Sequence, residues 1–255
     1  MRLTKANYHS INNRYLTASR LKDYIKDPYY FYRKHISGDL VEGATASMLI
    51  GSMVDSCITE SSAKFLKKYK PVDRRNLKNP PKGYIEVSRS EYETALEIID
   101  VLKNTSLYKD LKKDKFIGQK MVVRDMAIGQ YFIGLAGTVD LHRYYPDTKQ
   151  LVIIDLKTTV SVDDNKFRYI AEDLNYYLQL ALYGDLLSQY YGNVEKVDTY
   201  IWAAENKEPY RTKLFKLNPA ILELEHAHIA GLIEDIKNIK EYKKQDLSWD
   251  DVRGL

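Results

Sequence analysis

The sequence predicts a mixed α/β domain in which helices flank a central mixed β-sheet. Apolar residues recur at helical spacing up to about residue 107 and again over 165–192, whereas 119–160 is rich in β-branched and aromatic residues. The chain has 255 residues, of which 44% are hydrophobic and 29% charged, the balance of an ordinary folded protein. We therefore expect a single domain over residues 1–255.

The first predicted helices lie between residues 17 and 60. Thr17 can cap a helix that Pro28 interrupts, because proline cannot continue a helix interior. The segment ATASMLIGSMVDSCITE (44–60) is small and apolar enough to form a buried helix, in which Gly51 permits close approach to another element.

Residues 64–84 are predicted to form a basic loop. They contain eight Lys or Arg and a single acid, Asp73, and Pro71, Pro80 and Pro81 disfavour a regular helix. Charge runs are common on protein surfaces. A solvated linker and an arm that contacts DNA therefore both remain open.

The strand-like region is predicted to be an antiparallel meander. Its three apolar segments are separated by turn signals at Ile128-Gly129 and Pro146-Asp147. The later elements are a helical stretch at 165–192, strands at 196–204 and 210–217, and a final helix at about 219–244 that opens with Asn218-Pro219. This order of elements favours a mixed sheet.

The segment LVIIDLKTT (151–159) places two charged residues at the end of an apolar strand. Asp-x-Lys occurs five times in the chain, so the motif alone carries no weight. Only Asp155-Leu156-Lys157 closes an apolar strand. Strand alternation puts Asp155 and Lys157 on one face and turns Leu156 away.

Further carboxylates can join Asp155. Asp140 lies on the preceding strand of the meander, and the intervening turn can set it beside Asp155. Carboxylates that meet at an apolar core repel each other and lose solvation, which a divalent cation between them would offset. Oxygen ligands without Cys or His favour Mg²⁺ or Mn²⁺ over Zn²⁺. Asp55, on an otherwise small and apolar helix, is a third candidate; a position facing water is the alternative.

Gln179 and Tyr183 lie four residues apart and therefore on one helical face. Such a pair can hold a water, a phosphate or a catalytic side chain, and a partly buried polar seam is an equally open interpretation. The five histidines show no metal-ligand spacing, and we assign them no chemistry, with a reservation for His142 beside Asp140.

Four motifs together resemble those of a known superfamily: GSMVD (51–55), GTVD (137–140), IIDLKTT (153–159) and QLALY (179–183). Their order and spacing resemble the PD-(D/E)xK nucleases, and within them the RecB-type and lambda exonuclease-like branch that includes the prophage RecE-like exonucleases. The resemblance covers roughly residues 14–190. It implies a restriction-endonuclease-like core and a metal-dependent deoxyribonuclease, specifically an exonuclease that resects linear double-stranded DNA 5′ to 3′ for single-strand annealing recombination.

The resemblance also implies roles for individual residues, carried over by motif position. The implied metal ligands are Asp55, Asp140, Asp155 and the carbonyl of Leu156; the implied catalytic residues are Asp140, Asp155, Lys157, Gln179 and Tyr183; the implied contacts to DNA or its 5′-phosphate are Arg14, Ser19, Thr159 and Gln179. Asp55 stands where relatives have His or Glu, which leaves open whether one ion or two is bound. Val139 replaces the proline that names the superfamily.

The implied cofactor is Mg²⁺, for which Mn²⁺ can substitute. The implied partners are double-stranded DNA ends, a single-strand annealing protein and further copies of the chain in a ring-like trimer or tetramer. A structure-specific or restriction-type endonuclease, or a non-catalytic DNA-binding module on the same fold, are the alternatives. The sequence has no signal-peptide h-region and no membrane-spanning apolar run, so we expect it in the cytosol of a bacterium or a phage-infected host.

Overall fold

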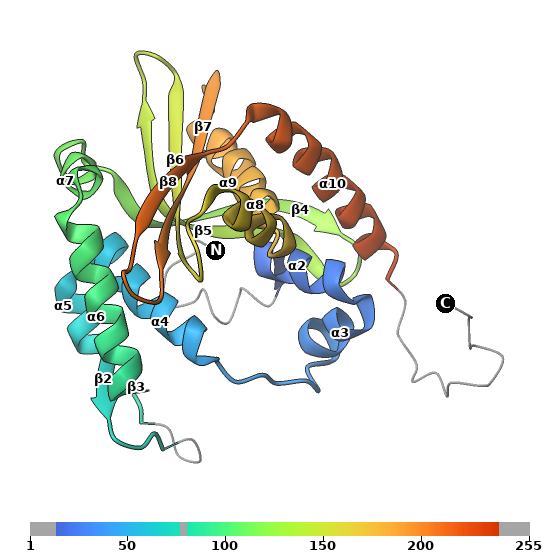
Figure 1. Cartoon of the computed structure of the whole chain (residues 1–255). Coiled ribbons are helices and arrows are strands. Elements are labelled where there is room, and N and C mark those ends of the chain that lie inside the picture. The colour runs from blue at the N-terminus through green and yellow to red at the C-terminus, as the bar shows by residue number, and fades with distance from the viewer. Residues whose placement is uncertain (1–13, 77–80, 240–255) are drawn as a thin grey trace.

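A six-stranded mixed sheet forms the centre of the computed structural model, which describes residues 14–76 and 81–239 (Figure 1). The strands run in the order β1-β5-β6-β7-β8, and β4 pairs with β5. Their bounds are β1 Tyr15–Leu16, β4 Ile117–Ile128, β5 Phe132–Tyr145, β6 Gln150–Thr159, β7 Lys196–Glu205 and β8 Thr212–Lys216. The mixed α/β prediction is confirmed.

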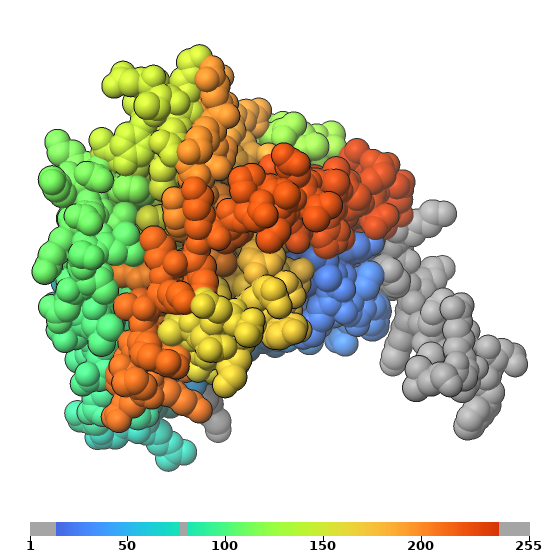
Figure 2. All heavy atoms as spheres, turned by 45° about the horizontal axis from the view of Figure 1, so that its top comes forward, coloured from blue at the N-terminus to red at the C-terminus, as the bar shows by residue number. Residues whose placement is uncertain are grey.

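Helices cover both faces of this sheet. They are α2 (Ala18–Lys26), α3 (Pro28–Tyr32), α4 (Ala46–Asp55), α5 (Ser62–Lys68), α6 (Arg89–Asn104), α7 (Ser106–Lys113), α8 (Asp164–Asp173), α9 (Tyr176–Tyr191) and α10 (Pro219–Lys237), with π-helical turns at Arg33–Ser37 and Ser56–Glu60. One core lies between the sheet and α2, α9 and α10, and the other between the sheet and α4 and α6. Figure 2 shows α10 (red) and α2–α3 (blue) on the same side of the molecule.

Strand β6 is buried on both faces, as the sequence predicts. Leu151 and Ile153 belong to the core beneath α9, whereas Ile154 and Leu156 belong to the core beneath α4 and α6. It pairs in parallel with β7 through the α8–α9 crossover and antiparallel with β5. The predicted meander of β4, β5 and β6 is confirmed.

The pairing of β5 with β6 stops partway along both strands. It runs from Tyr145 opposite Gln150 to Leu141 opposite Ile154. In the same register, the next two residues to face each other are Asp140 and Asp155. The strands therefore separate at this position, and we call the opening the β5–β6 fork. Farther along, the edge of β5 is taken by β1, which pairs with it at Gly134 and Leu135.

The predicted N-terminal caps are present. The Thr17 side chain accepts the backbone N–H of Arg20, and Pro28 is the first residue of α3 after α2 has ended at Lys26. Asn218 caps α10, whose helical conformation ends at Lys237 rather than near residue 244; residues 240–255 lie outside the described part. The helical stretch predicted over 165–192 is broken where Asn175 adopts a positive φ of 50°.

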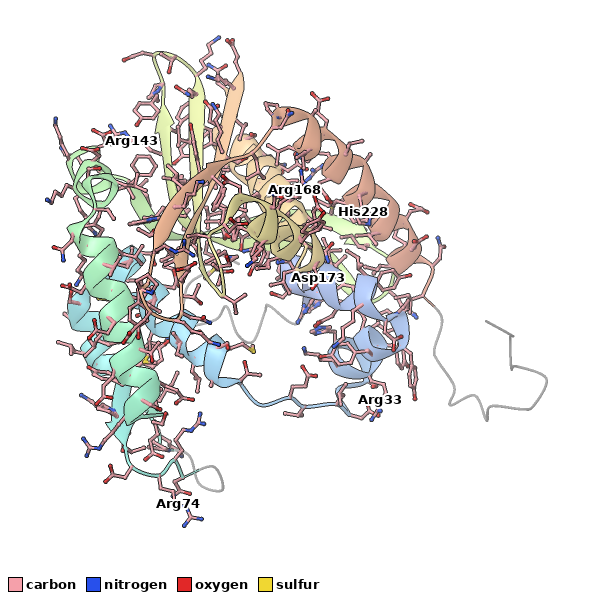
Figure 3. The ribbon with its side chains drawn as sticks, in the orientation of Figure 1. Arg33, Arg74, Arg143, Arg168, Asp173 and His228 are labelled. Atoms are coloured by element: carbon pink, nitrogen blue, oxygen red, sulfur yellow. The ribbon has the colours of Figure 1, made fainter. Side chains whose placement is uncertain are left out.

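The basic loop predicted at 64–84 is wrong over its first part. Residues 62–68 form α5, and β2 (Tyr69–Val72) pairs in parallel with β3 (Ile85–Ser88). The prolines all follow α5, so they do not interrupt it, and the buried Phe65 and Tyr69 anchor the segment to the core. We call α5, β2 and β3 together the basic arm. Figure 3 shows Arg74 at its tip, directed away from the rest of the protein.

Candidate active site

The β5–β6 fork brings Asp140 and Asp155 together. Because β5 no longer occupies that edge of β6, the backbone N–H of Leu156 donates to Asp140 Oδ2 at 3.0 Å. The N–H and carbonyl of one strand residue point to the same side, so the Leu156 carbonyl is also directed toward the fork. The sequence prediction that the hairpin sets Asp140 beside Asp155 agrees with this register.

Lys157 and α9 hold Asp155 from two sides. Lys157 Nζ lies 2.5 Å from Asp155 Oδ2, and Gln179 Nε2 donates to Asp155 Oδ1 at 3.0 Å. Gln179 Nε2 also lies 3.0 Å from the hydroxyl of Tyr183. The side chain of Asp155 is fully buried. The sequence left open whether Gln179 and Tyr183 hold a water, a phosphate or a catalytic side chain. In the structure, Gln179 contacts a side chain, the carboxylate of Asp155.

Gly137 in the GTVD motif allows α9 to pack this closely. A Cβ at residue 137 would lie 2.7 Å from Cε1 of Tyr183, which is closer than real side chains approach. Gly51 has the same function on α4, where a Cβ would lie 3.1 Å from Thr158 Oγ1 on β6. Both motif glycines thus serve close packing around the fork.

Asp55 approaches the fork from the last turn of α4, although the sequence left a solvent-facing position open. Its partner is Gln119 on β4. Gln119 Nε2 lies 3.0 and 2.8 Å from the two oxygens of Asp55, and 3.4 Å from Asp140 Oδ1. The hydroxyl of Thr59 also donates to Asp55 Oδ1 at 3.0 Å. Sequence reasoning missed Gln119 because no motif includes it.

Asp55 and Asp140 line a cavity of about 560 Å³, whereas the fully buried Asp155 does not reach its wall. Elements from both halves of the chain line it, through the residues Ser19, Ser47, Met48, Gly51, Ser52, Asp55, Asp140, Leu156, Lys157, Thr158, Leu174, Tyr176 and Gln179. Ser19, in the first turn of α2, is therefore at the site. The structure does not bring Thr159 or Arg14 to this cavity: Thr159 is buried and bonds to the backbone of Ser161, and Arg14 is exposed beside β1.

Burial and mutual repulsion perturb the acids. Burial, followed by the charges of Asp55 and Asp155, raises the pKa of Asp140 well above its usual range. Burial also raises the pKa of Asp55 to about 6. Burial alone would lower the pKa of Lys157, but the charges of Asp155 and Asp140 outweigh it and raise that pKa, so Lys157 is a cation at neutral pH.

A second lysine, which sequence reasoning also missed, lies beside the fork. Lys22 on α2 donates to Gln179 Oε1 at 2.8 Å, and its Nζ lies 5.2 Å from the ring centroid of Tyr176. Burial, followed by the charge of Lys157, lowers the pKa of Lys22 to about 8. Lys22 lies three residues after Ser19 on the same helix, and this spacing is the only feature of the sequence that could have indicated its place at the site.

His142, two residues from Asp140, is part of the core. It is fully buried, its Nε2 lies 2.9 Å from the hydroxyl of Tyr191, and burial lowers its pKa to about 4. The structure therefore gives it a packing role.

The fold and this site define a PDDEXK-like domain, in which two acids and a lysine meet where strands separate. Residues 17–248 match the family described as PDDEXK-like domain of unknown function (DUF3799), and the chain belongs to that family. A solved structure from Eubacterium rectale, titled "Putative exonuclease", is 18% identical, with a TM-score of 0.67 and 97% coverage of each chain. That likeness supports the fold.

A second solved structure, of SSO0001, gives a TM-score of only 0.32 at 14% identity, covering 84% of this chain and 86% of that one. No curated protein matches the chain. No helix in residues 14–76 and 81–239 has the length and apolar content to cross a membrane.

Nucleases with the PDDEXK fold typically use divalent metals. Across the described residues, no three Asp, Glu, His or Cys side chains are grouped so that they could hold an ion. The three predicted carboxylates therefore do not form one compact cage. Asp140, Asp155 and the Leu156 carbonyl nevertheless fit one hard cation, because they are oxygen donors at one fork and the buried carboxylates repel each other without it.

Proposed function

We propose that this chain is a metal-dependent deoxyribonuclease, specifically an exonuclease of the RecB-type and lambda exonuclease-like branch that degrades linear double-stranded DNA from its ends, 5′ to 3′. One arrangement carries the proposal: Asp140 and Asp155 directly follow the last paired residues of β5 and β6, Asp140 accepts from the Leu156 N–H, and Lys157 Nζ lies 2.5 Å from Asp155. A structural role alone would not require buried acids of raised pKa on the wall of an open cavity.

Asp140, Asp155 and the Leu156 carbonyl would hold a Mg²⁺ ion, for which Mn²⁺ can substitute. Such an ion, when bound, polarises a phosphate oxygen and lowers the pKa of a water. Lys157 enters the reaction as a cation, because its pKa is raised. Its role is therefore to stabilise negative charge on the phosphorus-bound oxygens rather than to accept the proton of the attacking water.

Gln179 orients Asp155, since its amide donates to that carboxylate while Lys22 fixes its oxygen. The Tyr183 hydroxyl completes this network. Ser19, at the start of α2 and on the cavity wall, would bind a DNA 5′-phosphate at the helix N-terminus.

The basic arm supplies a surface for the duplex. Lys67, Lys68, Arg74 and Lys82 are exposed on or beside it. Burial raises the pKa of Asp55, and the charge of Lys68 is among the weaker influences that oppose this rise, so the arm lies within electrostatic reach of the site. A single-strand annealing protein that receives the product strand and a ring of identical chains around DNA belong to the same proposal.

The test uses purified protein with Mg²⁺ and four substrates: linear duplex with and without a 5′-phosphate, nicked circles and closed circles. We expect degradation of linear duplex, faster with the 5′-phosphate, and release of a 5′ label before a 3′ label. Asp155→Asn should abolish it. Cutting of closed circles would show that the protein is an endonuclease and not an exonuclease. An absence of Mg²⁺-dependent hydrolysis would refute the proposal that it is a nuclease.

A further inference from the structure

Gln119 has an unusual backbone conformation for a strand residue. Its φ is +49°, in the left-handed region that side chains other than glycine rarely adopt. The neighbouring pairs Gly118–Leu141 and Lys120–Val139 place it directly opposite Asp140 on β5. Strain of this kind persists where the surrounding structure fixes it, and it is concentrated at functional sites.

The alternation of side chains between the two faces of the sheet is also interrupted in β5 at this point. Residues two apart on a strand normally face the same side, yet Val139 packs into the core beneath α9 and Leu141 into the core beneath α4 and α6. The change falls at Asp140. The conformation of Gln119 is therefore part of the distortion that presents Asp140 to the fork.

The Gln119 amide lies where the carboxylates of Asp55 and Asp140 converge. Its Nε2 is 2.8 Å from Asp55 Oδ2 and 3.4 Å from Asp140 Oδ1. The two N–H groups of Gln119 lie within hydrogen-bond distance of both carboxylate oxygens of Asp55. The single hydroxyl hydrogen of Thr59 is shared between the backbone carbonyl of Asp55 at 2.8 Å and its Oδ1 at 3.0 Å. Both carboxylate oxygens of Asp55 thus already have a donor beside them.

A cation shared by Asp55 and Asp140 would have to lie between the same oxygens. Mg²⁺ binds oxygen at about 2.0–2.1 Å, so it could not bind there while the amide nitrogen is within hydrogen-bond distance of both carboxylates. The amide and such an ion exclude each other. Between Asp140 and Asp155 the donors are the Leu156 N–H, Lys157 and Gln179, and Gln119 makes no described hydrogen bond to Asp155. Gln119 therefore competes only with an ion shared by Asp55 and Asp140.

We infer that Gln119 occupies the position of a second cation, and that the site consequently binds a single divalent ion held by Asp140, Asp155 and Leu156. The inference rests on the proposed metal-dependent function. It makes Gln119 a positioning residue, which holds the carboxylates of Asp55 and Asp140 through its N–H donors without contacting the substrate.

The experiment counts ions without DNA. Mn²⁺ is titrated into the full chain, and free Mn²⁺ is measured by electron paramagnetic resonance. We expect one bound ion per wild-type chain and a second in Gln119→Ala and Gln119→Glu, the latter because it adds a carboxylate. Lys115→Ala, at an exposed position with a similar φ of 54°, controls for alanine in this backbone conformation and should bind one ion.

The outcomes separate this inference from the proposed function. One ion in wild type and one in both Gln119 variants would overturn the inference and leave the nuclease intact. Two ions in wild type would overturn it directly, even if the Gln119 variants fail to fold. A wild-type chain that binds none would overturn both. A thermal melt in EDTA and in Mn²⁺ gives a second readout: Mn²⁺ should raise the Tm of Gln119→Ala more than that of wild type.

Discussion

Asp55→Asn should stabilise the protein at neutral pH when no metal is present. The folded structure raises the pKa of Asp55 from 3.8 to about 6, chiefly by burial. The folded state therefore keeps a proton that the unfolded state releases between these pH values, and wild-type stability falls as pH rises through them. Asparagine has the same shape, can still accept from Gln119 and carries no charge.

The size of the effect follows from the pKa shift. The rise in the pKa of Asp55 from 3.8 to about 6 corresponds to at most about 3 kcal/mol, and solvent screening reduces this value because the residue is only partly buried. For a chain of this size, 1 kcal/mol changes the Tm by roughly 2–4 °C. We expect Asp55→Asn to raise the Tm by up to roughly 10 °C at pH 7.5 in EDTA, and to leave it nearly unchanged at pH 4.

Thermal melts of wild type and Asp55→Asn at both pH values, in EDTA, provide the measurement. Ser52→Ala, on the same helix and also lining the cavity, is a matched control without a titratable group. An equal Tm change at pH 4 and pH 7.5 would show that the effect is not electrostatic. A lower Tm at pH 7.5 would refute the reasoning that the Asp55 charge opposes folding.

Three other predictions concern the basic residues Lys157, Lys22 and Arg74. Lys157→Met should lower the free energy of unfolding by about 3–5 kcal/mol in urea, because it leaves the buried Asp155 charge unpaired, and Lys157→Met combined with Asp155→Asn should recover most of this loss. In EDTA, where no metal supports hydrolysis, duplex DNA with a 5′-phosphate should bind more weakly as pH rises from 7 to 9, because Lys22, with a pKa of about 8, loses its charge; Lys22→Arg should abolish this dependence. Arg74→Glu should weaken duplex binding and reduce its salt dependence in electrophoretic mobility shifts, whereas the same charge change at the exposed Lys109 on α7 should leave both unchanged.

The proximity of Asp140 and Asp155 could be predicted from the sequence because its determinants are local, whereas the separation of the two strands there could not. A hairpin of known turn position fixes which residues face each other, and this register places Asp140 opposite Asp155. Strand alternation then places Lys157 beside Asp155. Both inferences need only the period of a strand and one turn.

The surroundings of the fork could not be predicted, because they depend on elements that meet only in the folded chain. Gln119 reaches Asp55 across 64 residues of sequence, and Lys22 reaches Gln179 across 157. No propensity predicts a positive φ at Gln119 within a strand. The α5 helix was missed for a different reason: the prolines that suggested a loop all follow it, its own lysines are compatible with an exposed helical face, and the burial of Phe65 and Tyr69 decides its position.

The separated edges of β5 and β6 bear on how inactive variants should be made. An unpaired strand edge can recruit the strand of another molecule and promote aggregation. Asp140 opposes such pairing at Leu156, because its carboxylate accepts the N–H of Leu156 that the strand of another molecule would otherwise bind. Alanine at 140 would expose that donor, so asparagine, which retains an acceptor oxygen, is the better choice for crystallisation or solution work.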